Sequence, residues 1–93
     1  DADQAADYEE RDELETRRRM LSKAMSVLND RERRIFEARR LADNPITLEE
    51  LSSEFDISRE RVRQIEVRAF EKVQDSVQKE ALAQAQALRV VDA

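Results

Sequence analysis

The sequence feature that most constrains the fold is a pair of helical patterns joined by a very short turn, between residues 47 and 73. Thr47 followed by Glu50 is a capping-box pattern that predicts the start of a first helix. Ser58 is a favourable N-cap for a second helix, and Ile57 is the apolar turn residue that can fill the space between the two. Apolar residues recur at steps of three and four along both helices: Leu48, Leu51 and Phe55 in the first, and Val62, Ile65, Ala69 and Val73 in the second. Two amphipathic helices joined by a turn of about three or four residues predict a helix-turn-helix over about 48–67.

The polar face of the second predicted helix carries side chains that suit the reading of base edges. Val67 and four polar residues lie opposite the apolar stripe: Arg59, Glu60, Arg63 and Gln64. The N-terminal turns of the second helix of a helix-turn-helix enter the major groove. There Arg can bind guanine, Gln can bind adenine, Glu can accept from cytosine, and an apolar side chain can contact a thymine methyl group. We therefore predict that the four polar residues read bases and that Arg61 and Arg68, on the flanks, face phosphates. The alternative is an ordinary solvated helix face.

Composition favours a single small helical domain. The chain has 93 residues, with no glycine, one proline, no cysteine and 42% charged residues. These values exclude a disulfide scaffold and a cysteine-based metal site. No apolar run approaches the length of about 18 residues that a membrane-spanning helix needs, and the acidic start lacks the apolar core of a signal peptide. We expect a cytoplasmic protein without a membrane partner, and the start without methionine suggests a fragment of a longer chain.

The net charge of −5 is unusual for a nucleic-acid binder, but the charge is unevenly distributed. Residues 1–15 hold eight carboxylates and one arginine, so the remainder of the chain has a small net positive charge. This change in the sign of the charge, from an acidic lead-in to a basic body, has two interpretations. The lead-in is either a solvated linker or an arm that competes with phosphates for the basic face.

Helical patterns also cover the part of the chain before the helix-turn-helix. An apolar stripe that begins at Leu14 predicts a helix over Tyr8–Leu28. Asn29, with Glu32 three residues later, predicts the capped start of another helix. That helix should end before Pro45, because the residue that precedes a proline is biased away from the helical region.

These patterns predict an all-α fold, a small domain of three to four helices. We expect an acidic flexible lead-in over residues 1–7, the domain over 8–74, and a helical tail over 75–93. The tail can continue the second helix of the helix-turn-helix, and its apolar stripe either folds back on the domain, pairs with a second copy or frays. Phe70 lies off the apolar stripe, so it packs on the first helix, on the tail, or against a partner.

The segment from 47 to 73 resembles the second half of region 4 of bacterial RNA polymerase sigma factors. The runs TLEEL, FDIS and RERVRQIE carry the similarity, and the last is specific because many positions match in a fixed frame. Upstream, LNDRERRIFEARRL over Leu28–Leu41 resembles the first half of region 4, so the matches cover roughly half of the chain. The joint ARRLADNPIT is short and lacks the glycine-containing loop of primary sigma factors. The chain therefore most resembles the heat-shock (sigma-32-type) alternative sigma factors.

This resemblance implies a role in promoter recognition. In the family, region 4 binds the promoter −35 element while it docks on the flap of the β subunit of RNA polymerase. The base-reading positions match the four polar residues named above. The family positions that contact the DNA backbone match a further set: Arg31, Arg39, Thr47, Leu48 and Glu49. The last three lie at a predicted helix start, where backbone N–H groups can bind a phosphate. The resemblance implies sequence-specific DNA binding in transcription initiation, of heat-shock or stress genes.

An enzymatic function lacks the residues that it would need. The sequence has no histidine, no cysteine and no glycine-rich phosphate loop, so we expect no catalytic site, metal site or cofactor. The main alternative is a helical protein-interaction module that binds a regulatory protein or a second copy through the apolar tail. Such a module has no need of four base-facing residues together. A response-regulator output domain shares the fold but not the run RERVRQIE.

Overall fold

The computed structural model describes the backbone of residues 2–92 and the side chains of residues 10–89. Over that backbone range it contains four α-helices, one π-helical turn and no strand. The elements are α1 (Ala2–Met25), α2 (Asp30–Phe36), the π-helix η1 (Glu37–Leu41), α3 (Leu48–Phe55) and α4 (Arg59–Asp92). The predicted all-α class, the helix-turn-helix and the extended C-terminal helix are confirmed.

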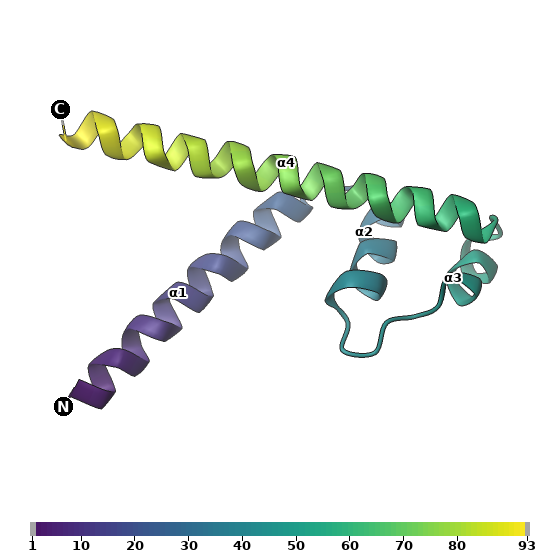
Figure 1. Cartoon of the computed structure of the whole chain (residues 1–93), viewed down its shortest axis with the longest axis horizontal. Helices are drawn as coiled ribbons and strands as arrows, with labels where there is room; N and C mark the ends of the chain where they lie inside the picture. Colours follow the sequence, from purple (N-terminus) through teal and green to yellow (C-terminus); the bar gives the residue numbers. More distant parts are fainter. Residues whose placement is uncertain (1, 93) are drawn as a thin grey trace.

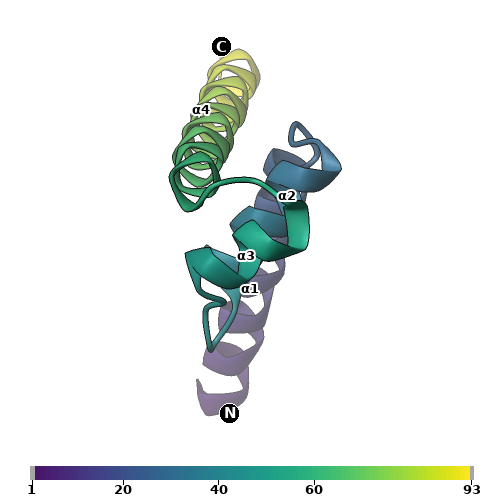
Figure 2. The same cartoon turned by 90° about the vertical axis from the view of Figure 1, so that its right-hand side faces the viewer.

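Helix α4 is the spine on which the other helices pack. It contacts α1, α2 and α3, and α1 and the C-terminal half of α4 diverge from their point of contact (Figure 1). Figure 2 looks from the end where α4 begins and shows α2 and α3 on one side of it. The molecule is consequently flat and open, with extents of 52 × 35 × 15 Å.

The apolar stripe of α4 runs through two adjoining core clusters. The first cluster joins α1 and α2 to the middle of α4 and consists of Ala24, Met25, Leu28, Phe36, Ala69 and Val73. The second joins the helix-turn-helix to α2 and η1 and consists of Ile35, Ala38, Leu51, Val62 and Ile65. Full burial of a side chain such as Ile35 or Leu51 stabilises the fold by roughly 1.5–3 kcal/mol. The second cluster therefore fixes the back of α4 directly behind the polar face predicted to read bases.

Side-chain caps define where three of the helices begin. Asn29 and Glu32 form the predicted capping box at α2, with bonds of 2.8 and 3.0 Å. Thr47 accepts from the N–H of Glu50 at α3, and Ser58 accepts from the N–H of Arg61 at α4. Between α3 and α4, Asp56 adopts the left-handed conformation with φ of 53°, and Ile57 packs against the second core cluster. The predicted caps and the packing of Ile57 are therefore confirmed, but α3 has only the Thr47 half of its predicted capping box.

Two helices end at other residues than the sequence predicts. The helix predicted to end before Pro45 changes to π geometry at Glu37 and ends at Leu41, so Ala42 is exposed and lies outside the helix. A π turn reduces the angle between consecutive side chains, and here Arg39 and Arg40 both reach the same carboxylate on α4. Helix α1 ends at Met25 rather than Leu28, and Leu14 of its predicted stripe is exposed.

The two ends of the chain are helical in the described range. Helix α1 begins at Ala2, so its backbone includes most of the predicted lead-in, while Asp1 lies outside the described residues. Flexibility of the lead-in remains a prediction. Helix α4 continues to Asp92 without a break, and its side chains from 81 to 89 are exposed. Over those residues the tail thus continues the helix and does not fold back on the domain.

Candidate nucleic-acid interface

The four predicted base-reading residues lie together on the exposed side of the first two turns of α4. Arg59, Glu60, Arg63 and Gln64 are all exposed. The opposite side of the same turns carries Val62 and Ile65, which are 0% and 5% exposed. The cap from Ser58 fixes the first turn, and the core fixes the rotation of the helix about its axis. These four side chains are therefore presented outward from a rigidly held segment.

Two of these residues are paired with each other. Arg63 donates to both carboxylate oxygens of Glu60, at 3.1 and 2.7 Å. The hydrogen bond and the charge of Arg63 lower the pKa of Glu60, and the same contact raises the pKa of Arg63. Because both side chains are exposed, the pair contributes little to folding and can be exchanged for other partners. This pair holds the guanidinium of Arg63 against Glu60 on the helix surface.

A shallow depression continues the polar face toward the C-terminal end of α4. Four of the seven side chains that line it are cationic. The seven are Arg61, Arg63, Gln64, Val67, Arg68, Glu71 and Lys72. The predicted phosphate-facing residues Arg61 and Arg68 are thus both beside the base-reading set. Val67 is 39% exposed, so its methyl groups are accessible to a thymine methyl at the same surface.

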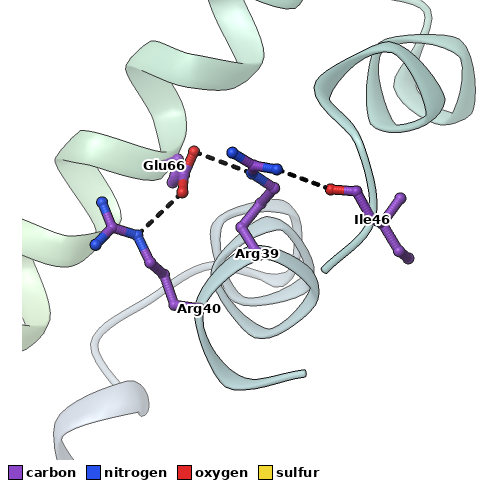
Figure 3. Close-up of polar contacts among 4 residues, drawn as sticks. All are labelled: Arg39, Arg40, Ile46 and Glu66. Carbon is purple, nitrogen blue, oxygen red and sulfur yellow. Dashed lines mark hydrogen bonds and ion pairs between the residues drawn. The ribbon is translucent and has the colours of Figure 1, made fainter. Parts of the chain in front are cut away.

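The predicted backbone contacts divide into two groups. Arg31 lies exposed in the first turn of α2, and Thr47, Leu48 and Glu49 form the start of α3. The N-terminal turn of a helix presents N–H groups and a partial positive charge, which favours a phosphate. Arg39, in contrast, is engaged within the protein. Its Nε donates to Glu66 at 3.3 Å and its Nη1 donates to the carbonyl of Ile46 at 3.0 Å (Figure 3).

Glu66 is a functional candidate that is not among the site residues predicted from the sequence. Its side chain is 8% exposed, and its second oxygen accepts from Nε of Arg40 at 3.0 Å. The guanidinium of Arg40 also lies 4.9 Å from the ring centroid of Phe70. Its burial could have been predicted from the sequence, because Glu66 is four residues after Val62 and three before Ala69, on the edge of the buried stripe. A carboxylate at such a position requires a cationic partner.

Two other ion pairs join helices near this surface. Buried Glu32 accepts from Lys72 of α4 at 2.7 Å. Burial alone would raise the pKa of Glu32, but the bonds from Lys72 and from the N–H of Asn29 outweigh it and hold the pKa below its usual value. Exposed Arg34 and Glu54 form a two-bond pair between α2 and α3, which lowers the pKa of Glu54 and raises that of Arg34.

Among the described residues, no group of three or more acidic side chains is arranged to hold a metal ion. Within the same part of the chain, no helix has the length and apolarity to cross a membrane.

Comparison with known proteins identifies relatives of this chain. The family described as Sigma-70, region 4 matches residues 24–75, which include α2, η1, α3 and the first half of α4. The RNA polymerase sigma factor RpoH of Rhizobium radiobacter is 87% identical over 84 residues, covering 90% of this chain and 28% of that protein. The factor of the same name from Zymomonas mobilis is 58% identical over 69 residues, covering 74% and 23%. The RNA polymerase sigma-C factor of Myxococcus xanthus is 41% identical over 71 residues, covering 76% and 23%. The chain therefore spans about a quarter of the length of these relatives.

Proposed function

The chain belongs to the sigma-70 region 4 family, and on that premise we propose that it recognises the −35 element of promoters while attached to RNA polymerase. The function is binding rather than chemistry. The chain selects where transcription starts, by holding a DNA sequence against the polymerase. The finer assignments, to particular bases, phosphates and a polymerase surface, belong to this proposal.

The observation that carries the proposal is the exposed face at the start of α4. Arg59, Glu60, Arg63 and Gln64 project from its first two turns, while the opposite side of those turns is buried in the core. A helix held in this way can enter the major groove without changing its own structure. Each good two-bond contact from Arg or Gln to a base is worth about 1–3 kcal/mol of discrimination. Two such contacts would be enough to distinguish a promoter element from most other sequences.

Phosphate contacts supply affinity and fix the register of the reading helix. We assign them to Arg31, to the start of α3 at Thr47, Leu48 and Glu49, and to the flanking Arg61 and Arg68. Each cation that neutralises a phosphate releases counterions, so binding should weaken as salt rises. Such contacts orient the protein on the duplex without reading sequence themselves. Arg39 instead bonds within the protein, to Glu66 and to the carbonyl of Ile46.

The polymerase partner and the class of promoter rest on the relatives. Two similar proteins are named RNA polymerase sigma factor RpoH, which supports a factor for heat-shock genes that acts with the polymerase in the cytoplasm. We propose that the flap of the polymerase β subunit binds apolar surface around α1, α2 and η1. Exposed Val27 and Leu41 offer such surface at either end of the segment formed by α2 and η1.

The test measures DNA binding of the chain with a fluorescently labelled duplex that carries a −35 element and with a scrambled duplex. Anisotropy is recorded across a salt series, in the presence and absence of the polymerase flap fragment. We expect tighter binding to the −35 duplex and an affinity that falls linearly with salt on logarithmic axes. Equal binding to both duplexes, with the flap present, would contradict the proposal. That result would favour a protein-interaction module, for which exposed Leu82 and Leu88 on α4 are the surface to examine.

A further inference from the structure

We propose that Glu66 is a positioning residue for base reading. Through Arg39 and Arg40 it holds the start of α3 at a fixed place relative to the base-reading face of α4. This inference rests on the proposed promoter-reading function and deepens it, because it names what sets the geometry between phosphate contacts and base contacts. The set of four residues drawn in Figure 3, which are Arg39, Arg40, Ile46 and Glu66, is called the clamp below.

The clamp connects three elements through one buried carboxylate. From α4, Glu66 accepts from Nε of Arg39 at 3.3 Å and from Nε of Arg40 at 3.0 Å. From η1, Arg39 continues to the carbonyl of Ile46 at 3.0 Å. Ile46 directly precedes Thr47, the N-cap of α3, and its own N–H donates to the carbonyl of Ala38 at 3.1 Å. Both the backbone N–H and the backbone C=O of Ile46, just before the phosphate-facing turn, are therefore hydrogen-bonded.

The π-helical turn makes this double contact possible. Arg39 and Arg40 are consecutive in sequence, yet their Nε atoms reach the two different oxygens of one carboxylate. In the wider π turn, consecutive side chains point in more similar directions than they do in an α-helix. Single π turns occur frequently at functional sites. The ring of Phe70 supports Arg40 from the same side of α4, since the guanidinium carbon lies 4.9 Å from the ring centroid.

The clamp is rigid because its carboxylate is almost removed from water. Glu66 is 8% exposed, and both of its oxygens have an arginine partner. A buried charge that loses its partner is strongly unfavourable, so each member of the clamp opposes displacement of the others. Arg39 meets a carboxylate and a carbonyl with two different nitrogens of its planar guanidinium, a geometry that lysine cannot reproduce with a single ammonium group.

The position of Glu66 on α4 links the clamp to base reading. Glu66 follows Gln64 by two residues and Arg63 by three, on the same continuous helix but toward its buried side. A rigid helix transmits the position of its buried side to its exposed side. If the start of α3 is anchored on a phosphate, the clamp determines how far Arg63 and Gln64 reach into the groove. Hydrogen bonds weaken steeply when distance or angle changes, and a site that is about 1 Å too loose loses function.

The chain also offers a matched control. Glu54 makes two bonds to Arg34, as an acidic residue that joins α3 to α2. That pair is exposed and does not include α4. Replacing either glutamate by glutamine removes one negative charge, so both variants gain the same general attraction to phosphates. Only the variant at Glu66 alters the link between α3 and the reading helix.

The experiment compares Glu66→Gln, Arg39→Lys and the control Glu54→Gln in the 93-residue chain with the polymerase flap fragment present. The quantity measured is the ratio of affinities for the −35 duplex and the scrambled duplex. A fall in the folded fraction lowers both affinities by the same factor and cancels in this ratio, so a purely structural role leaves the ratio unchanged. Thermal melts by circular dichroism establish the folded fraction of each variant. Arg39→Lys keeps the charge and tests the guanidinium geometry alone.

We expect Glu66→Gln and Arg39→Lys each to lower the ratio by about fivefold to tenfold, the loss expected when one base contact is misplaced. The control Glu54→Gln should retain the ratio of the parent. In an Arg63→Ala background, Glu66→Gln should have a smaller effect, because the two residues then act on the same contact.

Two contrary results have different meanings. If the parent discriminates between the duplexes and both clamp variants discriminate equally well, the clamp does not position the reading face, and the promoter-reading function stands without it. If the parent itself shows no discrimination, the promoter-reading function is overturned and the clamp inference falls with it.

Discussion

Two buried carboxylates, Glu32 and Glu66, carry much of the specificity of this small fold. Glu32 of α2 is neutralised by Lys72 of α4. Glu66 of α4 is neutralised by two arginines of η1. Glu32 additionally closes the capping box at the start of α2. Buried ion pairs contribute little net stability compared with apolar packing, but breaking one partner is costly. These residues therefore select one arrangement of the helices rather than simply strengthening it.

The pKa of Glu32 makes stability depend on pH in a defined direction. Its pKa lies below the ordinary value of 4.5 in the folded chain, so the unfolded chain binds the proton first as pH falls. The stabilisation is complete above pH 4.5 and is lost as pH falls through the lowered pKa. Glu32→Gln should therefore unfold more easily at neutral pH and lose less stability on acidification than the parent. Urea unfolding at about pH 7 and about pH 3.5 measures this difference.

The control for that experiment is Glu71→Gln, at an exposed position on α4. It should retain the parent's loss of stability on acidification. The acid loss in Glu32→Gln should be reduced rather than abolished, because the pKa values of Glu54 and Glu60 are also lowered. An identical acid loss in Glu32→Gln and in the parent would contradict the role assigned to Glu32.

At the scale of elements, the helix-turn-helix and its caps could be predicted from the sequence, because capping residues and apolar steps are local patterns. Asn29, Thr47 and Ser58 all cap as predicted. The change to π geometry in η1 could not be predicted, because it accompanies contacts between Arg39, Arg40 and a residue on a distant helix. For the same reason the family pattern predicts Arg39 as a contact to the DNA backbone, but it does not predict the bonds of Arg39 to Glu66 and Ile46 within the protein.

The cap at Ser58 fixes the first turn of the reading helix. Its hydroxyl accepts from the N–H of Arg61 at 3.0 Å. Ser58→Ala should lower the free energy of unfolding by about 1 kcal/mol, the usual cost of losing such a cap. Urea denaturation followed by circular dichroism measures it. The matched control is Ser53→Ala, an exposed position within α3, which should not destabilise the chain because alanine favours helix. Equal stability of Ser58→Ala and the parent would show that the cap contributes nothing.

At the scale of the whole molecule, the domain is compact only around the first half of α4. The core ends near Val73 and Val77. Just beyond it, Lys23 of α1 and Glu80 of α4 form an ion pair at 3.0 Å. Beyond it the side chains from 81 to 89 are exposed. The sequence predicted a helical tail but left its packing open, because an alanine-rich stripe is too weakly apolar to specify a partner.

Removal of residues 81–93 should therefore leave the fold intact. The shortened chain retains Glu80 and every member of both core clusters. We expect its free energy of unfolding to lie within about 0.5 kcal/mol of the parent, as for other changes away from the core. Its helical circular dichroism signal should fall in proportion to the residues removed. Thermal and urea unfolding test this expectation, and a control truncation after Lys72 should unfold the chain because it deletes Val73. A large loss of stability on removing 81–93 would mean that the tail has a partner, such as a second copy.

The central claim is that the exposed face at the start of α4 reads bases, and single-base mapping with Arg63→Ala tests it most directly. Each base pair of the −35 duplex is changed in turn, and the affinities of parent and variant are measured for the whole set. We expect Arg63→Ala to lose about 1–3 kcal/mol on the unchanged duplex and to become indifferent to substitution at one base pair, the pair that Arg63 contacts. At every other position the parent and the variant should lose affinity equally. If Arg63→Ala binds every duplex in the set as the parent does, Arg63 reads no base and the assignment of this face is wrong.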